Sequence, residues 1–420
     1  MADGAAPVPP PSQPVIRAVA GDLPRRLRRI LALDDFEPAA RARLPRPLFG
    51  YIAGAAETNA SLRDNCDVFG EWAFRPRYLV DVSRRSQAAT LFGTAYKTPF
   101  GIAPMGISAM MAYRGDLALT RAAAAAGVPM IMSGSSLIPL EEIVRANPDA
   151  WFQAYLPGEP DRIAALVGRV ADAGYRTLVL TVDTTTLGNR ENNIRTGFST
   201  PLKPSPRLAW DGAIRPIWLW DVMARTLRHH GMPHFENSYA TRGAPIIAKS
   251  VQRDFGARDH LNWSHLAQIR RGWTGKLVVK GILTGEDAAR CREEGADGVI
   301  VSNHGGRQLD GAIAPLRAVP EVRAAAGDMA VMMDGGVRRG SDVLKAIALG
   351  ADFVFVGRPM LYAAAVGGEA GVRHAISILS EEVHRNLAFL GCNRIGEVGM
   401  RHLVRIAGVP SPSPDPTSRE

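Results

Sequence analysis

The chain has 420 residues, of which 46% are hydrophobic and 22% are charged, so it can bury a large core and lacks the composition of a disordered protein. Its formal net charge of +9 favours anionic ligands or an anionic membrane surface, while the absence of basic runs interleaved with aromatic residues argues against nucleic-acid binding. No apolar run approaches the roughly 20 residues that a membrane-spanning helix requires.

The cysteines and the termini predict an intracellular protein. The cysteines Cys66, Cys291 and Cys392 lie far apart and match no metal-binding or redox spacing, so we expect a reducing compartment and no metal site. The N-terminus is rich in Ala and Pro and lacks the pattern of a signal peptide. We therefore expect a cytoplasmic protein with disordered tails at 1–21 and 405–420.

The ordered domain is expected at residues 22–404, and residues 22–90 are expected to form helices and a short hairpin that cap it. After them a unit recurs, in which a helical stretch ends in a glycine that can close its C-terminus and leads to a short apolar run. Continuous apolar runs, as opposed to alternating ones, predict parallel strands buried on both faces. The predicted strands cover residues 100–104, 129–133, 151–155, 177–183, 276–280, 298–302, 330–334 and 353–357.

Eight such strands separated by helical segments predict an α/β protein with a (β/α)8 TIM barrel. A doubly wound open sheet is the alternative, but it would carry a dinucleotide-binding fingerprint after its first strand, and the sequence has none. The spacing between strands is roughly even except after the fourth strand, where residues 188–264 form a long insertion. An insertion of this length in a compact domain is usually functional or a small subdomain.

Polar and ionisable residues follow nearly every predicted strand, which is where barrel enzymes carry their catalytic groups. Residues 334–340 and 357–358, after the last two strands, combine glycines with arginines and predict a phosphate site. After the sixth strand, His304 is suited to accept a proton near neutral pH, and Arg307 can hold a carboxylate. A single histidine at a strand end can be structural, but its combination with Arg190, Arg307, Tyr51 and Lys280 favours catalysis.

Several motifs carry a resemblance to a known family. They are YIAGAAE at 51–57, FRP at 74–76, LTVD at 180–183, VKG at 279–281, VSNHGGRQLD at 301–310, DGGVRRG at 334–340 and GRP at 357–359. Together they resemble the FMN-dependent α-hydroxy-acid oxidising family, which includes glycolate oxidases, lactate dehydrogenases and mandelate dehydrogenases. The likeness runs from about residue 44 to residue 403. It implies that the chain binds FMN and oxidises an L-2-hydroxy acid to the 2-oxo acid.

The resemblance also implies roles for individual residues. His304 would be the catalytic base, with Asp183 stabilising its cationic form. Tyr155 would hydrogen-bond the substrate hydroxyl or the developing carbonyl oxygen, and Lys280 would stabilise negative charge on the reduced flavin. The substrate carboxylate would be held by Tyr51, Arg190 and Arg307. The flavin would be held by Pro104, Met105, Gly106, Ser133, Gln153, Thr181, Lys280, Ser302, Asp334, Gly336, Arg338, Gly357 and Arg358.

Three positions depart from the pattern of the family. Met105 stands where many members have Thr, and Gly106 stands where glycolate oxidases have Ala; both changes would alter the surroundings of the flavin. Ser135 stands where glycolate oxidases have Trp. Because a small residue leaves space there, we expect a substrate bulkier than glycolate, such as lactate or an aryl hydroxy acid like mandelate.

The composition of the insertion suggests which acceptor takes the electrons from the enzyme. Residues 214–230 contain two tryptophans and end in a basic cluster, a combination that suits a membrane interface. The segment resembles the long loop of bacterial respiratory lactate dehydrogenases, so we expect electrons to pass to a quinone or another respiratory carrier at the cytoplasmic face of the inner membrane. The alternative is an amphipathic helix packed on the barrel or on a neighbouring subunit. The resemblance further implies a homotetramer.

Other functions fit parts of the sequence. An FMN-dependent oxidase of a biosynthetic hydroxy or amino substrate, using oxygen, would share the flavin site and differ in the carboxylate clamp. The intact set of Tyr51, Arg190 and Arg307 favours a hydroxy acid, although an amino acid also has a carboxylate. A non-catalytic flavin-binding protein would be expected to lack His304 or Lys280, and both are present. A phosphosugar isomerase built on the same barrel would be colourless.

Overall fold

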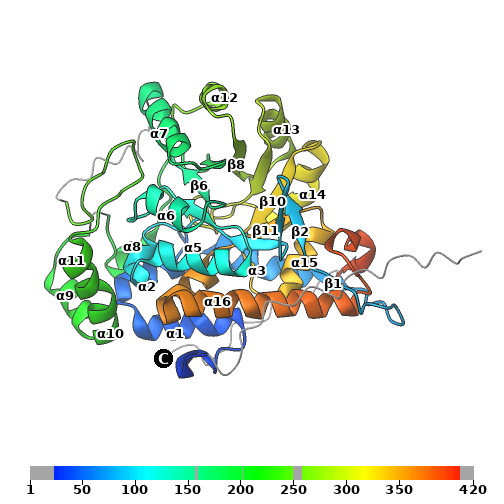
Figure 1. Cartoon of the computed structure of the whole chain (residues 1–420), viewed down its shortest axis with the longest axis horizontal. Coiled ribbons are helices and arrows are strands. Elements are labelled where there is room, and N and C mark those ends of the chain that lie inside the picture. Colours follow the sequence, from blue (N-terminus) through cyan, green and yellow to red (C-terminus); the bar gives the residue numbers. More distant parts are fainter. Residues whose placement is uncertain (1–22, 157–158, 201, 249–257, 407–420) are drawn as a thin grey trace, which may run out of the picture.

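The computed structural model describes residues 23–156, 159–200, 202–248 and 258–406, and eight parallel strands form its centre (Figure 1). Their spatial order is β4-β11-β10-β9-β8-β7-β6-β5, and a parallel bridge between Ile102 and Met130 joins the two ends of the sheet. The predicted (β/α)8 barrel is therefore confirmed. The strands are β4 (Phe100–Ile102), β5 (Ile131–Ser133), β6 (Trp151–Ala154), β7 (Thr177–Thr181), β8 (Lys276–Ile282), β9 (Gly298–Val301), β10 (Ala330–Asp334) and β11 (Phe353–Val356).

The interior of the barrel is filled by apolar side chains. The hairpin of β2 (Ala89–Leu91) and β3 (Thr94–Tyr96) closes the end at which the strands begin, where the Tyr96 ring lies 5.8 Å from the Phe353 ring. The opposite, C-terminal end is thereby left for a ligand site. The side chains packed inside are Ile131, Trp151, Val179, Val278, Ile300, Met332, Phe353 and Phe355.

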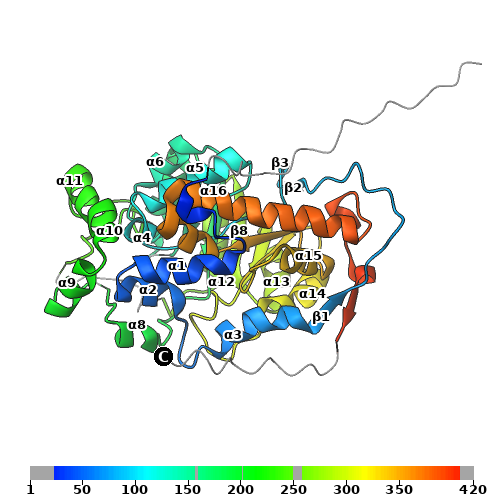
Figure 2. The same ribbon diagram turned by 90° about the horizontal axis from the view of Figure 1, so that it is seen from below.

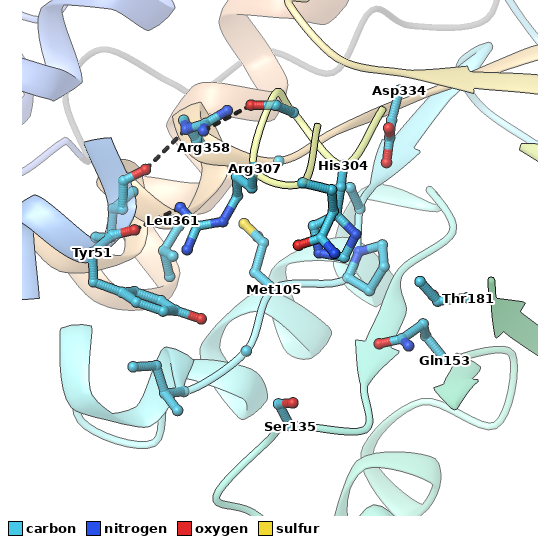
Figure 3. A pocket seen from close by; sticks show the side chains of 18 of the residues that line it. Tyr51, Met105, Ser135, Gln153, Thr181, His304, Arg307, Asp334, Arg358 and Leu361 are labelled. Carbon is cyan, nitrogen blue, oxygen red and sulfur yellow. Dashed lines mark hydrogen bonds between the residues drawn. The ribbon is translucent and has the colours of Figure 1, made fainter. Parts of the chain in front are cut away.

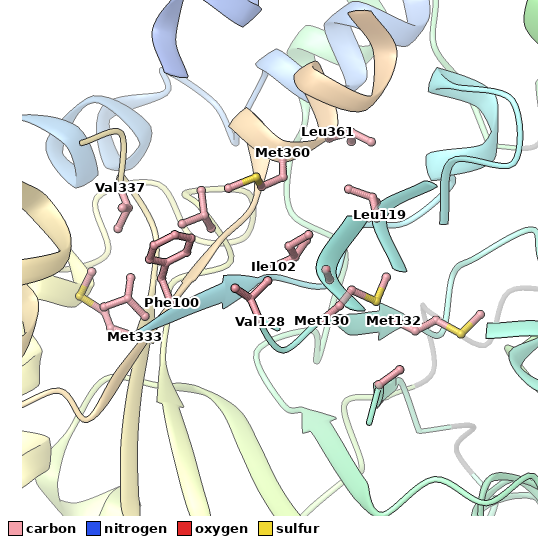
Figure 4. Close-up of a cluster of buried hydrophobic side chains, with 14 of the residues drawn as sticks. Phe100, Ile102, Leu119, Val128, Met130, Met132, Met333, Val337, Met360 and Leu361 are labelled. Carbon is pink, nitrogen blue, oxygen red and sulfur yellow. The ribbon is translucent and has the colours of Figure 1, made fainter. Parts of the chain in front are cut away.

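A second apolar layer packs between the strands and the surrounding helices, and Figure 4 shows part of it around Phe100, Ile102 and Met360. Gly127 ends α5 with a φ of +65°, a left-handed conformation that glycine adopts without a steric penalty. The last helix, α16, is broken at Gly368. The helices around the barrel are α4 (Ser108–Met111), α5 (Gly115–Ala126), α6 (Leu140–Ala146), α7 (Pro160–Asp172), α12 (Trp263–Gly272), α13 (Gly285–Glu293), α14 (Pro315–Ala325), α15 (Gly340–Ala348) and α16 (Arg358–Phe389).

The residues before the barrel form the expected helices, but the hairpin of β2 and β3 lies at 89–96, beyond the predicted limit of residue 90. The helices are α1 (Phe36–Arg43), α2 (Arg46–Ala53) and α3 (Ala60–Asp67), with 3₁₀ turns at Arg25–Leu27, Leu33–Asp35 and Val68–Glu71. Strand β1 (Trp72–Phe74) pairs antiparallel with β12 (Leu403–Arg405), after 3₁₀ turns at Ile395–Glu397 and Met400–His402. Strand β12 therefore extends one residue beyond the predicted limit of the domain. The remainder of the predicted C-terminal tail from residue 407, and the predicted N-terminal tail 1–21, lie outside the described residues.

The insertion after β7 forms its own helical group at one end of the molecule, drawn in green in Figures 1 and 2. It contains α8 (Glu191–Thr196), α9 (Pro206–Ala213), α10 (Pro216–Trp218), a π-helical turn (Leu219–Ala224) and α11 (Arg225–His230). The Trp218 indole Nε1 donates to the carbonyl of Met110 at 2.8 Å and ties this group to the barrel. Of the two tryptophans expected at a membrane interface in 214–230, Trp218 is therefore buried against the barrel, and only Trp220 is exposed. Among the described residues, no helix combines the length and the hydropathy that a membrane span needs.

Candidate active site

A pocket lies at the C-terminal ends of the barrel strands, and side chains from many strands point into it (Figure 3). The parallel strands bring residues that are far apart in the sequence to one end of the barrel. This is why the residues that follow the strands could be predicted to form one site. Most of the residues predicted for the site line this pocket: Tyr51, Pro104, Met105, Gly106, Gln153, Tyr155, Thr181, Arg190, Lys280, His304, Arg307, Asp334, Gly336, Arg338, Gly357 and Arg358.

His304 and Asp183 form a hydrogen-bonded pair. The distance between His304 Nδ1 and Asp183 Oδ1 is 2.9 Å. Asp183 packs against Gly281, where an added Cβ would lie 2.7 Å from the Asp183 Cβ, so glycine permits this close approach. With Nδ1–H donated to the carboxylate, Nε2 of the neutral imidazole is left as the proton acceptor.

Burial lowers the pKa of His304, and the surrounding charges lower that of Asp183. The carboxylate of Asp183 opposes the shift in the pKa of His304 only in part. Burial alone would raise the pKa of Asp183, but His304, Lys280 and Arg190 together lower it below its usual value. At neutral pH the pair is therefore a neutral base beside a carboxylate, which is the state that can take up a proton.

Two arginines lie at one wall of the pocket. Nη1 of Arg307 donates to the carbonyls of Tyr51 at 2.7 Å and Gly54 at 2.8 Å, and its guanidinium lies 4.8 Å from the centroid of the Tyr51 ring. Arg190 donates from Nε to the Arg307 carbonyl at 3.1 Å and from Nη2 to Gln308 Oε1 at 2.6 Å. Burial and the neighbouring Arg190 lower the pKa of Arg307 to about 9, so it stays cationic at neutral pH. Buried positive charge of this kind is stabilised by an anion in the pocket.

The two tyrosines of the pocket are held by aromatic contacts. The ring of Tyr51 lies 4.6 Å from that of Phe198, and the ring of Tyr155 lies 6.4 Å from the His304 imidazole. Burial raises the pKa of Tyr155 above its usual value. Its hydroxyl therefore remains protonated at neutral pH and is able to donate a hydrogen bond.

Lys280 is a buried cation with fixed partners. Its Nζ lies 2.9 Å from Asp334 Oδ2 and donates to Ser302 Oγ at 2.8 Å. Ser302 Oγ also accepts from the His304 backbone N–H at 3.0 Å. The hydroxyl of Ser302 thus connects the lysine to the loop that carries the histidine.

The loops after β10 and β11 have the features expected of a phosphate site. Gly336 has a φ of +78°, and a Cβ there would lie 1.7 Å from the Asn65 carbonyl oxygen, so only glycine fits. Arg338 lines the pocket and pairs through Nε with Asp34 at 3.2 Å. Arg358 also lines it, and donates from Nη2 to the carbonyl of Gly305 at 3.0 Å. Glycines and arginines therefore meet at one side of the pocket, as the sequence predicted.

Residues 40–405 match the model of the FMN-dependent dehydrogenase family. The chain belongs to this family. It is 39% identical over 379 residues to the (S)-mandelate dehydrogenase of Pseudomonas putida, covering 90% of this chain and 94% of that protein. It is also 39% identical over 384 residues to the L-lactate dehydrogenase of Pseudomonas aeruginosa strain LESB58, covering 90% and 99% of the two chains.

The solved structures agree with this membership. The crystal structure of the monotopic membrane protein (S)-mandelate dehydrogenase matches with a TM-score of 0.82 and 38% identity, over 90% of this chain and all of that chain (100%). The protein is therefore an FMN-dependent oxidoreductase that acts on 2-hydroxy acids, and the predicted family, cofactor and class of enzyme are confirmed.

As an FMN-dependent dehydrogenase, the chain must offer polar partners to a flavin, and the pocket does so. Within the part of the chain that the structure describes, Gln153 Nε2, Thr181 Oγ1 and Asp334 Oδ1 are buried polar atoms without a hydrogen-bond partner. All three residues line the pocket. Buried polar atoms are normally satisfied, and the isoalloxazine edge and ribityl hydroxyls of FMN provide both donors and acceptors for them.

Two of the residues predicted to contact the flavin lie behind the pocket wall. Ser133 Oγ lies 3.2 Å from Gln153 Oε1, and Ser302 bonds Lys280, so each contacts a pocket residue. Sequence reasoning also missed part of the wall, because the insertion has no strand periodicity that assigns its residues to a face. The missed pocket residues of the insertion are Asn193, Phe198, Ser199, Thr200, Phe235 and Ile246, and Leu187 lies directly before it.

Proposed function

We propose that this FMN-dependent dehydrogenase oxidises a lactate-like or aryl L-2-hydroxy acid, such as mandelate, and passes the electrons to a quinone or another respiratory carrier. The observation that carries the proposal is that His304, whose pKa is lowered by burial, lines the same pocket as the half-buried cations Arg190 and Arg307. Oxidation of a hydroxy acid requires a base beside a carboxylate that is held in place.

The carboxylate of the substrate would be clamped by Arg307 and Arg190, with the Tyr51 hydroxyl as a further donor. Among the described residues, Nη2 of Arg307 is buried without a partner, while Nη1 is bound to two carbonyls. The fixed side of the guanidinium thus orients its other N–H groups for a carboxylate. This contact would set the orientation of the substrate in the pocket.

His304 would take up a proton from the substrate at Nε2. Asp183, bound at Nδ1, would stabilise the imidazolium that results, and the protonated Tyr155 hydroxyl would donate to the hydroxyl oxygen of the substrate. When bound, FMN supplies the acceptor for the two electrons that the alcohol loses. Lys280, held by its ion pair with Asp334, would place positive charge beside the flavin and favour its reduced, anionic form.

Thirteen residues were predicted to hold FMN, and we propose that they do so in four groups. Pro104, Met105 and Gly106 would lie against the ring. Ser133 and Ser302 would act through Gln153 and Lys280, because both serines lie behind the pocket wall. Thr181 and Asp334 would bond the flavin directly, and the phosphate would be held by Gly336, Arg338, Gly357 and Arg358.

The substrate side chain would occupy the part of the pocket beside Ser135. An added Cβ at Gly106 would lie 3.0 Å from the Ser135 Cβ, so both small residues face the same region. Apolar side chains, Phe198, Phe235 and Ile246, complete the lining. Space together with an apolar wall favours an aryl or alkyl side chain over the hydrogen of glycolate.

The helical group of the insertion would dock on a membrane surface. Trp210 and Trp220 expose 67% and 69% of their surface, and Ile217 exposes 53%. Arg225 and Arg228 follow on α11. Exposed tryptophans next to arginines favour the interface of an anionic bilayer, where a membrane-soluble quinone would be available. We further propose the family's homotetramer as the assembled form, which size-exclusion chromatography with light scattering would test.

Anaerobic reduction tests the proposed reaction. The purified yellow holoenzyme is mixed without oxygen with L-lactate, L-mandelate or glycolate, and the visible flavin band is followed. Bleaching by lactate or mandelate, faster than by glycolate, supports the proposal. Reoxidation is then compared between a quinone analogue and dissolved oxygen. Rapid peroxide formation, with slow reduction of the quinone analogue, would favour the oxygen-using oxidase.

A further inference from the structure

Arg258 is a buried arginine at the end of the insertion. It contacts residues of the active-site wall but is not itself one of the predicted site residues. It exposes only 5% of its surface. Its Cζ lies 5.1 Å from the centroid of the Tyr155 ring, and Nη1 lies 3.4 Å from Thr184 Oγ1. Thr184 lines the pocket and directly follows Asp183 in the chain. Arg258 therefore connects the end of the insertion with two neighbours of the reacting groups.

The position of this charge matters for Tyr155. A guanidinium within about 6 Å of an aromatic centroid is attracted to the ring, and the attraction is greater when both are desolvated. The same positive charge stabilises negative charge on the phenol oxygen, which makes the hydroxyl of Tyr155 a stronger hydrogen-bond donor. Burial and the carboxylate of Asp183 raise the pKa of Tyr155, whereas Arg190 and Arg258 act in the opposite direction.

We propose that Arg258 is a positioning residue for the oxidation, which holds the Tyr155 ring and strengthens the hydrogen bond from its hydroxyl to the substrate oxygen. The inference rests on the proposed function, in which Tyr155 donates to the hydroxyl oxygen of the substrate. According to this proposal the insertion contributes to the oxidation itself, in addition to the membrane contact proposed for its exposed tryptophans.

A double-mutant cycle on the holoenzyme tests the proposal. Arg258→Met should lower the anaerobic rate of flavin reduction by L-mandelate about tenfold, which corresponds to about 1.4 kcal/mol. In a Tyr155→Phe background the same change should have little further effect, because the hydroxyl through which Arg258 acts is gone. Arg258→Lys should recover part of the rate, since it keeps the charge and loses the planar stacking.

A second measurement separates positioning from a general distortion of the pocket. Phenylacetate lacks the 2-hydroxyl group, so its binding, followed by the change in the flavin spectrum, should be the same for wild type and Arg258→Met. Arg169 offers a matched control, because it also links the insertion to the barrel, by donating from Nη1 to the carbonyl of Glu236. Arg169→Met should leave the rate of flavin reduction unchanged in the folded holoenzyme.

The outcomes are distinct. An equal loss of rate from Arg258→Met with and without the Tyr155 hydroxyl would overturn the proposal, and so would weakened phenylacetate binding. If Arg258→Met does not fold, the cycle is run with Arg258→Lys, and additive losses would again contradict the inference. Failure of the proposed function itself is recognised separately, because then the wild-type flavin would be bleached by none of the hydroxy acids.

Discussion

Asp183 Oδ1 lies 2.9 Å from His304 Nδ1, on the side of the imidazole opposite the nitrogen that is left to accept a proton. The carboxylate therefore fixes the tautomer of the histidine and stabilises its cation. The same relationship explains why Asp183 stays ionised although it is buried, since His304, Lys280 and Arg190 all lower its pKa.

Replacing this carboxylate should disable the base while leaving the fold intact. Asp183→Asn can present an amide N–H to the imidazole, which favours the wrong tautomer. We expect the rate of flavin reduction to fall by about 10³–10⁴, in line with such changes in other histidine–carboxylate pairs. Stopped-flow reduction measures this loss. A decrease of only a few fold with bound flavin would contradict the role given to Asp183.

The pH dependence follows from the direction of the His304 shift. Burial lowers its pKa below the usual 6.5, so kcat/KM should be constant between that pH and the alkaline range in which Arg307, with a pKa of about 9, loses its charge, and should decrease at more acidic pH, where His304 becomes protonated. Asp183 acts to raise this pKa, so Asp183→Asn should move the acidic limb to still lower pH. A limb that moves to higher pH in the variant would contradict the assignment.

Arg307→Lys should weaken the hold on the substrate carboxylate. Lysine keeps the charge but not the planar fork, so kcat/KM should fall by about 100-fold, or about 2.7 kcal/mol. Arg242→Lys is a suitable control, because Arg242 pairs with Glu236 on the insertion and is not among the pocket residues. Similar kinetics for the two variants would argue against a carboxylate at Arg307.

Ser135→Trp should change the choice of substrate. An indole would fill the space beside Gly106, so kcat/KM for L-mandelate should fall about 100-fold more than that for glycolate. Ser135→Ala, which preserves the space, should leave the preference unchanged. Equal losses for both substrates in Ser135→Trp would place the side chain of the substrate elsewhere.

Trp210→Ala combined with Trp220→Ala should reduce binding to vesicles that contain anionic lipid by about 10- to 100-fold. Both side chains are exposed, so flavin reduction by L-mandelate in solution should be unaffected. Vesicle sedimentation gives the comparison. Unchanged sedimentation would favour the alternative in which this surface packs on another subunit.

The barrel could be predicted because its signals are local. Buried parallel strands such as β7 (Thr177–Thr181) are continuous apolar runs, and glycines such as Gly127 mark the ends of helices. The convergence of His304, Arg307 and Lys280 then follows from the fold, because the C-terminal ends of barrel strands share one face.

The parts that were missed depend on packing that local patterns do not encode. Phe235 and Ile246 reach the pocket through the path of the insertion, and Arg258 reaches Tyr155 in the same way. Whether a strand-end residue lines the pocket also depends on side-chain contacts: Ser133 contacts Gln153 and is not among the pocket residues, so its contact with the flavin stays a prediction.

The central claim is tested most directly by anaerobic mixing of the holoenzyme with L-mandelate, with His304→Gln as the matched variant. Rapid bleaching of the wild-type flavin, with formation of the 2-oxo acid and no bleaching of His304→Gln on the same timescale, is the predicted result. A wild-type flavin that neither L-mandelate nor L-lactate reduces, or a His304→Gln variant that is reduced as fast as wild type, would contradict the account.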